Sequence, residues 1–182
     1  MDPSRSLLVM LATKGSGHYG EASVTQLEHA LQCAEMAEIS GASPHMIAAA
    51  LLHDIGHLIN GDDGAADRGV DMGHEHVGAD YLAQWFPKAV TEPVRLHVAA
   101  KRYLVSADSR YGDRLSPASR QSLTVQGGPF SDSEIDQFMA QDFAEDGVTL
   151  RIWDESAKVG GLKTPGLHHF KPFLQAALKS RD

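Results

Sequence analysis

Apolar residues recur along most of this chain at intervals of three and four positions. In residues 23–40 they are Val24, Leu27, Leu31, Ala34 and Ile39. Because an α-helix turns once in about 3.6 residues, this spacing gathers the apolar side chains on one helical face. No segment has the strict alternation of apolar and polar residues that is typical of a half-buried strand. The pattern therefore predicts an all-α protein.

Capping residues indicate where the helices begin. Asp2-Pro3, Ser43-Pro44 and Ser116-Pro117 each combine an N-cap residue with proline at the first helical position. Ser131 and Glu134 have the spacing of a capping box. We therefore expect a compact bundle of about seven to nine helices, over approximately residues 3–14, 23–40, 44–58, 74–85, 87–104, 117–125, 131–142, 149–158 and 168–178.

Composition and charge narrow the class of protein. The 182 residues, 42% hydrophobic and 22% charged, are typical of one globular domain. The net charge of −8 argues against a nucleic-acid binder, which needs a basic surface. The single cysteine excludes an intrachain disulfide and a thiolate metal cage, so we expect a reducing, cytoplasmic location. No apolar run approaches the ~20 residues of a membrane span, and residues 6–12 are too short for a signal peptide.

Histidine is the unusual component, with ten residues. His53 and Asp54 are adjacent in an apolar segment that is predicted to be helical, and burying such a pair costs free energy unless it is hydrogen-bonded or bound to metal. Other histidines and a lone carboxylate also stand beside apolar residues before and after this pair. Together they form our candidate set of metal-binding and catalytic residues: His29, His53, Asp54, His74, His97 and Asp154.

The chemistry of these six side chains indicates the kind of metal. Four imidazoles and two carboxylates, without sulfur, suit iron, manganese, zinc or nickel rather than calcium or an iron–sulfur cluster. Six ligands are too many for one catalytic metal with open positions, but they suit two metals that share a carboxylate. Asp54 lies between the two halves of the set and is the natural bridge.

The order His, His-Asp, Asp resembles the HD-domain superfamily, which is all-helical and named after the adjacent pair. Within it, five segments resemble the PhnZ-like phosphonate oxygenases, which hold a mixed-valent di-iron centre. The resemblance covers residues 21–154 and is weaker beyond. The segments are Gln26-Leu-Glu-His-Ala-Leu-Gln-Cys-Ala34, His74-Glu-His-Val-Gly-Ala-Asp-Tyr-Leu82, His97-Val-Ala-Ala-Lys-Arg-Tyr-Leu-Val105, Gln126-Gly-Gly-Pro129 and Trp153-Asp154.

This resemblance implies an activity and its cofactors. It implies two iron ions, Fe(II) and Fe(III), with O₂ as co-substrate, and oxidative cleavage of the C–P bond of an organophosphonate. The implied substrate is 1-hydroxy-2-aminoethylphosphonate or its N-trimethyl analogue, and the products are phosphate with glycine or glycine betaine. It also implies one HD-type domain over residues 1–182: a metal core at about 21–154, an N-terminal helix and lid loop at 1–20, and C-terminal helices at 155–182. The sequence does not set the oligomeric state.

The resemblance also implies residues that contact the substrate. Lys101, Ser119 and Arg151 match positions that contact the phosphonate, and His57 matches a histidine near the substrate. Gln126 could add a hydrogen bond.

The residues near the amine end of the substrate include one departure from the family. Glu21 matches the family's amine-contacting glutamate. The family's lid tyrosine aligns with His18, while Tyr19 lies next to it. The resemblance therefore leaves open whether the substrate carries a primary amine or a trimethylammonium group.

Three other functions fit parts of the pattern. An HD phosphohydrolase would act on a nucleotide or phosphate ester through a metal-bound hydroxide and would need no oxygen. An HD sensor would bind a phosphorylated ligand without turnover, and an inositol oxygenase would share the di-iron centre. The complete ligand set argues against the sensor, and Lys101, Arg151 and the Gln126-Gly-Gly segment favour a phosphonate over inositol.

Several other motifs are better explained by a structural role than by catalysis or cofactor binding. Gly15-Ser-Gly-His-Tyr-Gly20 fits a dinucleotide fingerprint, but we expect a helix rather than a strand before it, and we interpret it as a lid loop. His53-Asp-Ile-Gly-His57 lacks the glutamate base of a zinc protease. Cys33 is predicted to be a buried core residue. The remaining histidines are expected at the surface: His45, His76, His168 and His169.

Overall fold

The structure, a computed structural model, describes residues 2–17, 23–61 and 70–180. Over these ranges it contains eleven α-helices and no β-strand, which confirms the all-α prediction and exceeds the expected seven to nine helices. The proposed lid and amine-contacting residues, His18, Tyr19 and Glu21, lie outside the described ranges. The helices are α1 (Pro3–Lys14), α2 (Gln26–Ile39), α3 (Pro44–Leu52), α4 (Ile55–Asn60), α5 (His74–Leu82), α6 (Lys88–Ala107), α7 (Ser109–Arg114), α8 (Pro117–Val125), α9 (Asp132–Met139), α10 (Ala144–Ser156) and α11 (Leu167–Ala177).

Two helices account for the higher number. The single helix predicted over residues 44–58 is interrupted at the His53-Asp54 pair, where Asp54 has φ −99° and ψ 12°, so α3 and α4 are separate. The expectation that this pair lies inside a helix is therefore wrong. Helix α7 is only 6 residues long, and fewer than two turns are too short to give a periodic signal. It forms around Tyr111, whose side chain is buried.

The predicted N-terminal caps are confirmed. Asp2, Ser43 and Ser116 each accept a hydrogen bond from a backbone N–H in the first turn of the helix that follows. Ser131 and Glu134 form the expected capping box of α9. A second capping box, between Thr25 and Glu28, begins α2 three residues later than predicted and fixes the helix that carries His29.

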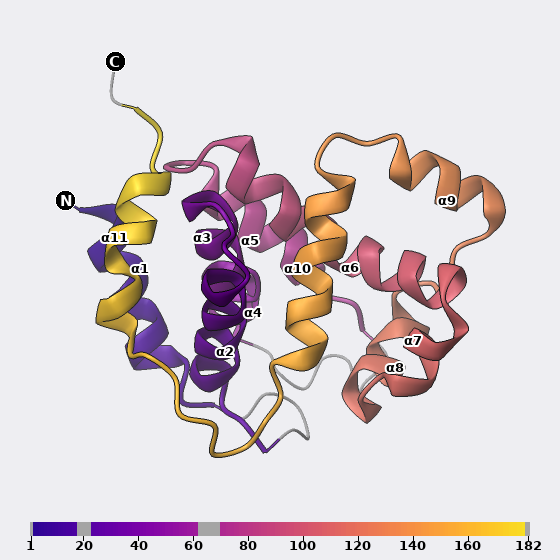
Figure 1. Cartoon of the computed structure of the whole chain (residues 1–182), viewed down its shortest axis with the longest axis horizontal. Helices are drawn as coiled ribbons and strands as arrows, with labels where there is room; N and C mark the ends of the chain where they lie inside the picture. Colours follow the sequence, from indigo (N-terminus) through magenta and orange to yellow (C-terminus); the bar gives the residue numbers. More distant parts are fainter. Residues whose placement is uncertain (1, 18–22, 62–69, 181–182) are drawn as a thin grey trace.

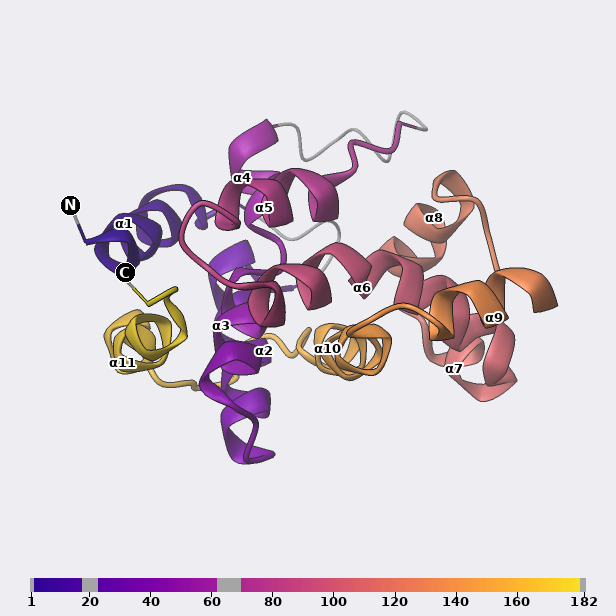
Figure 2. The same cartoon turned by 90° about the horizontal axis from the view of Figure 1, so that it is seen from above.

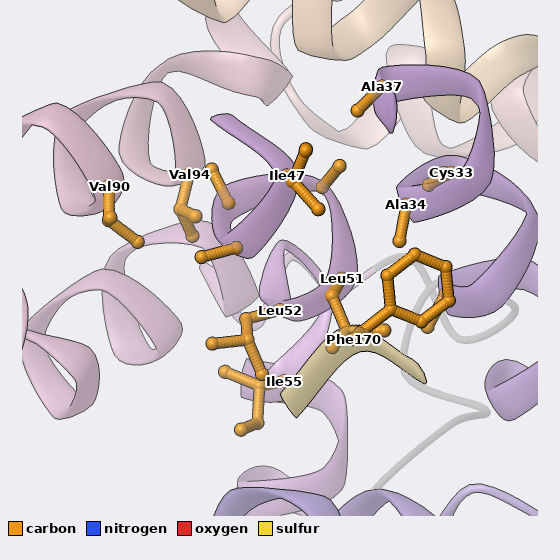
Figure 3. Close-up of a cluster of buried hydrophobic side chains, with 14 of the residues drawn as sticks. Cys33, Ala34, Ala37, Ile47, Leu51, Leu52, Ile55, Val90, Val94 and Phe170 are labelled. Atoms are coloured by element: carbon orange, nitrogen blue, oxygen red, sulfur yellow. The ribbon is translucent and has the colours of Figure 1, made fainter. Parts of the chain in front are cut away.

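Helix α3 lies at the centre of the bundle. All its residues from Met46 to Leu52 are buried, because α2, α6, α10 and α11 pack around it. Helices α1 and α11 cover one end of the molecule, while α7, α8 and α9 gather at the other end of α6 (Figures 1 and 2). Figure 3 shows Leu51 of α3 close to Phe170 of α11, with Val90 and Val94 of α6 on the other side. The main hydrophobic core is therefore built around α3.

Helix α10 connects the two ends of the molecule. It packs along α6, and Figure 1 shows it between the α2–α3 region and the α6–α9 region. Its residue Gly147 lies against Leu96, where a Cβ atom would come within 2.9 Å of the Leu96 Cβ. This close approach brings the polar residues of α10 toward those of α6. Within the described ranges, no helix is both long enough and apolar enough to cross a membrane.

Candidate metal centre

The six candidate ligands come from five parts of the bundle and meet in its interior. Helix α2 carries His29, the α3–α4 junction carries the His53-Asp54 pair, and α5 begins with His74. His97 lies on α6 and Asp154 on α10. All six side chains are buried, with at most 8% of any residue exposed. The sequence-predicted set is therefore brought together as one cluster.

The first half of the cluster contains four residues. The Nε2 atoms of His29 and His53 are 3.2 Å apart. Asp54 Oδ2 lies 3.6 Å from the first of these nitrogens and 3.4 Å from the second. Asp154 Oδ1 lies 3.3 Å from His29 Nε2 and 4.0 Å from His53 Nε2. Two nitrogens and two oxygens therefore surround one small volume.

The second half uses the other oxygen of the same aspartate. The Nε2 atoms of His74 and His97 are 3.2 Å apart. Asp54 Oδ1 lies 3.3 Å from His74 Nε2 and 3.6 Å from His97 Nε2. The carboxylate of Asp54 thus presents Oδ2 to one pair of histidines and Oδ1 to the other, which is the arrangement of a bridging ligand.

Hydrogen bonds at the far side of the rings orient the histidines. The Nδ1 atoms of His29, His53 and His97 lie 2.7 Å, 2.9 Å and 2.7 Å from the carbonyl oxygens of Ala157, Ala50 and Val94. A carbonyl oxygen can only accept, so each Nδ1 donates its proton. In a neutral imidazole this leaves a lone pair on Nε2, directed into the cluster. Metal-bound histidines typically donate their other ring N–H to a backbone carbonyl or a carboxylate in this way.

This donor set fits metal ions. When His29 and His53 are both neutral in these tautomers, two lone pairs face each other at 3.2 Å, so either a proton on one ring or a metal ion must lie between them. Ligands about 2.1 Å from a metal lie about 3.0–3.4 Å from one another, in agreement with the spacing here. Within the described part of the chain, Asp54 Oδ2 and Asp154 Oδ1 are buried and accept no hydrogen bond. Both atoms point to a cation as their missing partner.

The electrostatics of the cluster favour charged carboxylates. Burial by itself would raise the pKa of Asp54, but His53 and His74 hold that pKa well below its ordinary value. Burial likewise opposes ionisation of Asp154, and Arg151 and Lys158 hold its pKa well below the usual range. Both aspartates are therefore anionic at neutral pH.

The imidazoles respond differently to the same surroundings. Burial favours the neutral form of His53, but Asp54 and Asp154 outweigh it and raise its pKa to about 9. Burial, helped by His74 and His53, lowers the pKa of His97 well below its ordinary value. A metal that binds to His53 must consequently displace a proton.

Two neighbours of the cluster have other roles. Cys33 Sγ lies 4.0 Å from His29 Nε2 and is fully buried, as predicted for a core cysteine. Burial, with Asp154 and Asp54 nearby, raises the pKa of the Cys33 thiol well above its usual value, so this sulfur stays protonated. The ring of His57 stacks on His74 with the centroids 4.0 Å apart, and burial lowers its pKa to about 3. His57 is therefore a neutral residue beside the second half of the cluster.

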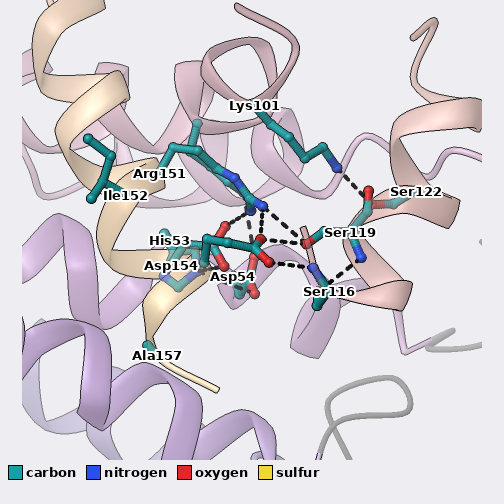
Figure 4. A network of polar contacts seen from close by, with 12 residues as sticks. His53, Asp54, Lys101, Ser116, Ser119, Ser122, Arg151, Ile152, Asp154 and Ala157 are labelled. Carbon is teal, nitrogen blue, oxygen red and sulfur yellow. Dashed lines mark hydrogen bonds and ion pairs between the residues drawn. The ribbon is translucent and has the colours of Figure 1, made fainter. Parts of the chain in front are cut away.

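A group of polar residues adjoins the first half. The Arg151 guanidinium contacts Asp154 Oδ2 and Glu155, and it donates to the hydroxyls of Tyr111 at 2.8 Å and Ser119 at 3.1 Å. Figure 4 shows Arg151 beside Asp154, with Ser119 opposite. In this structure Arg151 therefore holds the second oxygen of Asp154, so that the first oxygen faces His29.

Two lysines bring further positive charge to this region. Lys101 Nζ donates to Ser122 Oγ at 2.7 Å (Figure 4). Burial, together with the charges of Arg151 and Lys158, lowers the pKa of Lys101 to about 7. Lys158 Nζ lies 3.0 Å from Ser119 Oγ and 3.8 Å from Asp154 Oδ1. We call the group of side chains formed by Lys101, Ser119, Arg151, Glu155 and Lys158 the cationic pocket; the name denotes this group and not a cavity.

Two members of this group were not predicted from the sequence. Lys158 and Glu155 were not among the predicted site residues, although a signal was available. Lys158 follows Asp154 by four residues and Glu155 follows Arg151 by four, which is the spacing of neighbours on one helical face.

The Gln126-Gly-Gly segment forms a turn directly after α8. Gly127 and Gly128 have positive φ values of 97° and 71°, a backbone conformation that residues other than glycine rarely adopt. Arg102 fixes the segment by donating to the carbonyl oxygens of Gly128 at 2.7 Å and Gly127 at 3.3 Å. Gln126 precedes this turn as the C-cap of α8, and its Oε1 atom is buried.

The histidines that were predicted to lie at the surface are away from the centre. His76, His168 and His169 are exposed, as expected, whereas His45 is half-buried at the start of α3. Helix α1 directly precedes the glycine-rich segment at residues 15–20, so the preceding strand of a dinucleotide fingerprint is replaced by a helix.

An all-helical bundle whose adjacent His-Asp pair joins further histidines and a distant aspartate defines the class of HD-domain metalloproteins. The HD domain family matches residues 27–120, and this chain belongs to that family. The chain is 46% identical to the hydroxymethylphosphonate dioxygenase of Gimesia maris over 96% of its own length and 87% of the relative's. It is 41% identical to the glycine-betaine-forming [1-hydroxy-2-(trimethylamino)ethyl]phosphonate dioxygenase of Leisingera caerulea, over 89% of this chain and 83% of that one. It is also 39% identical to an uncharacterized protein of Acanthamoeba polyphaga mimivirus, over 88% and 74% of the two chains.

Proposed function

We propose that this protein is an iron-dependent dioxygenase that cleaves the C–P bond of a 1-hydroxyphosphonate and releases phosphate. The observation that carries the proposal is the division of Asp54 between two pairs of histidines, which supplies donors for two metals and argues against a phosphohydrolase with one metal. A two-metal phosphohydrolase would share this arrangement. The relatives named as phosphonate dioxygenases support the same reaction class. The overall change, one 1-hydroxyphosphonate plus O₂ to one carboxylic acid plus phosphate, balances in atoms and electrons.

We assign two iron ions to the two halves of the cluster. His29, His53, Asp54 and Asp154 would hold one ion, and Asp54, His74 and His97 would hold the other. The nitrogen and oxygen donors suit iron, and the second set leaves positions for further ligands. When bound, the irons would supply the activation of O₂ and the redox chemistry at C1 of the substrate.

The chain's own residues would bind and orient the phosphonate. Lys101, Arg151 and Lys158 concentrate positive charge beside the first half of the cluster, although the protein as a whole is acidic. A dianionic phosphonate would be attracted to this pocket and would lie next to the metal-facing oxygen of Asp154. Ser119, which accepts from Arg151, would add a hydroxyl, and Gln126 at the C-terminal end of the same helix would add an amide. His57, which is neutral and stacked on His74, would fix the orientation of the His74 ring as a metal ligand.

The group attached to C1 distinguishes the candidate substrates. The Gimesia maris relative is named for hydroxymethylphosphonate, which carries no amine, and the Leisingera caerulea relative for a trimethylamino compound. To the two aminoethyl compounds predicted from sequence we therefore add hydroxymethylphosphonate. Its products would be formate and phosphate, whereas the amino compounds would give glycine or glycine betaine. His18 in place of the family's lid tyrosine is compatible with a substrate that lacks a primary amine.

The test is release of phosphate by the iron-loaded, partly reduced protein. Hydroxymethylphosphonate, 1-hydroxy-2-aminoethylphosphonate and its N-trimethyl analogue are supplied separately, each with and without O₂. We expect oxygen-dependent phosphate from at least one of them, with the matching carboxylic acid in equal amount. Oxygen-independent release of phosphate from a phosphate ester, with no cleavage of any phosphonate, would instead identify a phosphohydrolase. Lys163→Ala, which changes an exposed residue, is the control for effects of purification and iron loading on the variants discussed below.

A further inference from the structure

Glu155 follows the candidate ligand Asp154 and turns its carboxylate into the cationic pocket. Its Oε1 atom accepts the backbone N–H of Ser116 at 2.7 Å. Its Oε2 atom accepts the Ser119 hydroxyl at 2.7 Å and the Lys158 ammonium at 3.0 Å, and it also contacts the Arg151 guanidinium. The side chain of Glu155 is only 11% exposed. One carboxylate thus gathers four donors.

These four donors form an anion receptor. A backbone N–H at the start of α8, a hydroxyl, a guanidinium and an ammonium are the groups that bind oxyanions in proteins, and hydrogen bonds to charged partners are the stronger kind. Ser119 and Arg151 are also two of the residues that the family resemblance relates to the phosphonate. A phosphonate in this pocket would therefore meet donors that already serve Glu155.

The protons of these donors cannot serve both anions. Ser119 has one hydroxyl proton, and it is given to Glu155, while Arg151 and Lys158 donate to the Ser119 oxygen at 3.1 Å and 3.0 Å. A phosphonate oxygen that accepts from Ser119 must take this proton away from Glu155. The carboxylate would also repel a dianion held in the same pocket, because both are negative and poorly screened from each other.

We propose that Glu155 is an internal anion that occupies the donors of the phosphonate subsite and is displaced when substrate binds. Ser119 and Lys158 then transfer their hydrogen bonds from Glu155 to the phosphonate. Without substrate, Glu155 keeps the positive charges of this group in position and lowers its affinity for anions. The inference rests on the proposed function for the identity of the anion and on the described contacts for the competition.

The test measures the binding of methylphosphonate to the iron-loaded protein by isothermal titration calorimetry. This probe has the phosphonate group but no 1-hydroxyl group and is not a substrate of the proposed reaction. We expect Glu155→Gln to lower the Kd for methylphosphonate by about tenfold or more, since the variant removes a like charge and keeps the shape of the side chain. Glu145→Gln is the matched control, because Glu145 lies exposed on the same helix and the variant has the same net charge. The control should leave the Kd unchanged.

An unchanged or higher Kd in Glu155→Gln, relative to the control, would overturn the inference and identify Glu155 as a positioning residue alone. If the wild-type protein shows no measurable binding of methylphosphonate, measurable binding by Glu155→Gln supports the inference. No measurable binding by either protein overturns the inference. These outcomes do not depend on turnover. Tighter binding without C–P cleavage would contradict only the proposed function, whereas cleavage with an unchanged Kd would contradict only the role of Glu155.

A measurement on the wild-type protein covers the case in which Glu155→Gln does not fold. A crystal structure of the iron-loaded protein with methylphosphonate should show the Glu155 carboxylate beyond hydrogen-bond distance of Ser119 and Lys158, with the phosphonate in its place. A phosphonate bound elsewhere, with the contacts of 2.7 Å and 3.0 Å intact, would overturn the inference.

Discussion

Asp54 contacts all four candidate histidine ligands through its two oxygens. Replacing it with asparagine keeps the shape of the side chain but exchanges one oxygen for an amide NH₂, which cannot bind a metal. We expect Asp54→Asn to reduce the iron content from two ions to one or fewer per chain and to abolish oxygen-dependent phosphate release. Elemental analysis and the phosphate assay on the same sample measure both effects.

The matched control for this variant is Asp80→Asn. Asp80 is an exposed carboxylate on α5, the helix that begins with His74, and it pairs with Arg95 at the surface at 2.7 Å. The Asp80→Asn variant should leave both the iron content and the activity unchanged. Two ions per chain and full turnover in Asp54→Asn would show that the bridge is not required.

Lys101 should make substrate binding sensitive to pH. In the free protein its pKa is lowered to about 7 by burial and by the charges of Arg151 and Lys158. The ammonium is present below this pKa and is lost above it, so the affinity for an anionic phosphonate should fall as the pH rises through about 7. Lys101→Arg keeps its charge throughout, because guanidinium does not deprotonate in this range. The KM measured from roughly pH 6 to 9 should therefore rise less in Lys101→Arg than in the wild type.

Comparing the wild type with Lys101→Arg separates the titration of Lys101 from that of the substrate, because ionisation of the substrate affects both proteins equally. Identical pH profiles would exclude titration of Lys101 as the cause. Lys101→Ala should raise KM at neutral pH more than it lowers kcat, and an unchanged KM would remove this residue from the binding site.

At the scale of elements, the contact between α4 and α5 positions His74. Gly56 of α4 lies so close to the start of α5 that an added Cβ would be 2.0 Å from the carbonyl oxygen of His74. Gly56→Ala must push the two helices apart. We expect it to lower the free energy of unfolding by about 1–3 kcal/mol or more, as measured by denaturant titration. It should also reduce the iron content, since His74 moves away from Asp54.

Gly166→Ala provides the comparison for this variant. Gly166 precedes α11 with φ −77°, and no atom lies within 4 Å of the position of an added Cβ. Its stability should change little. If Gly56→Ala were as stable and as rich in iron as Gly166→Ala, the close approach of α4 and α5 would not set the position of His74.

The helices themselves could largely be predicted from local chemistry. Asp2, Ser43, Ser116 and Ser131 begin helices where expected, because a side-chain cap acts within one turn. The break at His53-Asp54 could not be predicted this way. The apolar periodicity continues through it, and the helix ends there because the two side chains must reach the same cluster, which depends on residues far along the chain.

For the whole molecule, the metal centre should contribute to stability. Five elements meet at the buried cluster, and a bound metal would join donor atoms from all of them. A ligand that binds only the folded state and is present at 100 times its Kd stabilises it by about 2.7 kcal/mol. For a chain of this size we therefore expect removal of the metal by a chelator to lower the melting temperature by roughly 5–10 °C.

Differential scanning calorimetry with and without chelator measures this effect. Asp54→Asn serves as the control, because it should already have lost much of the stabilisation and should show a smaller shift. A melting temperature that does not respond to the chelator in the wild type, while iron is shown to leave, would mean that the cluster is held by the bundle alone.

By itself, the sequence determined the all-α class, the helix starts that carry a capping residue and the six candidate ligands, because capping and periodicity are local and because buried histidines and aspartates are costly without a partner. The tertiary structure decided how these residues meet. It assigned Oδ2 of Asp54 to His29 and His53 and Oδ1 to His74 and His97. It also brought Glu155 and Lys158 to Ser119, on a different helix. Such contacts join positions distant in sequence, and they follow from how α10 packs against its neighbours rather than from any local pattern.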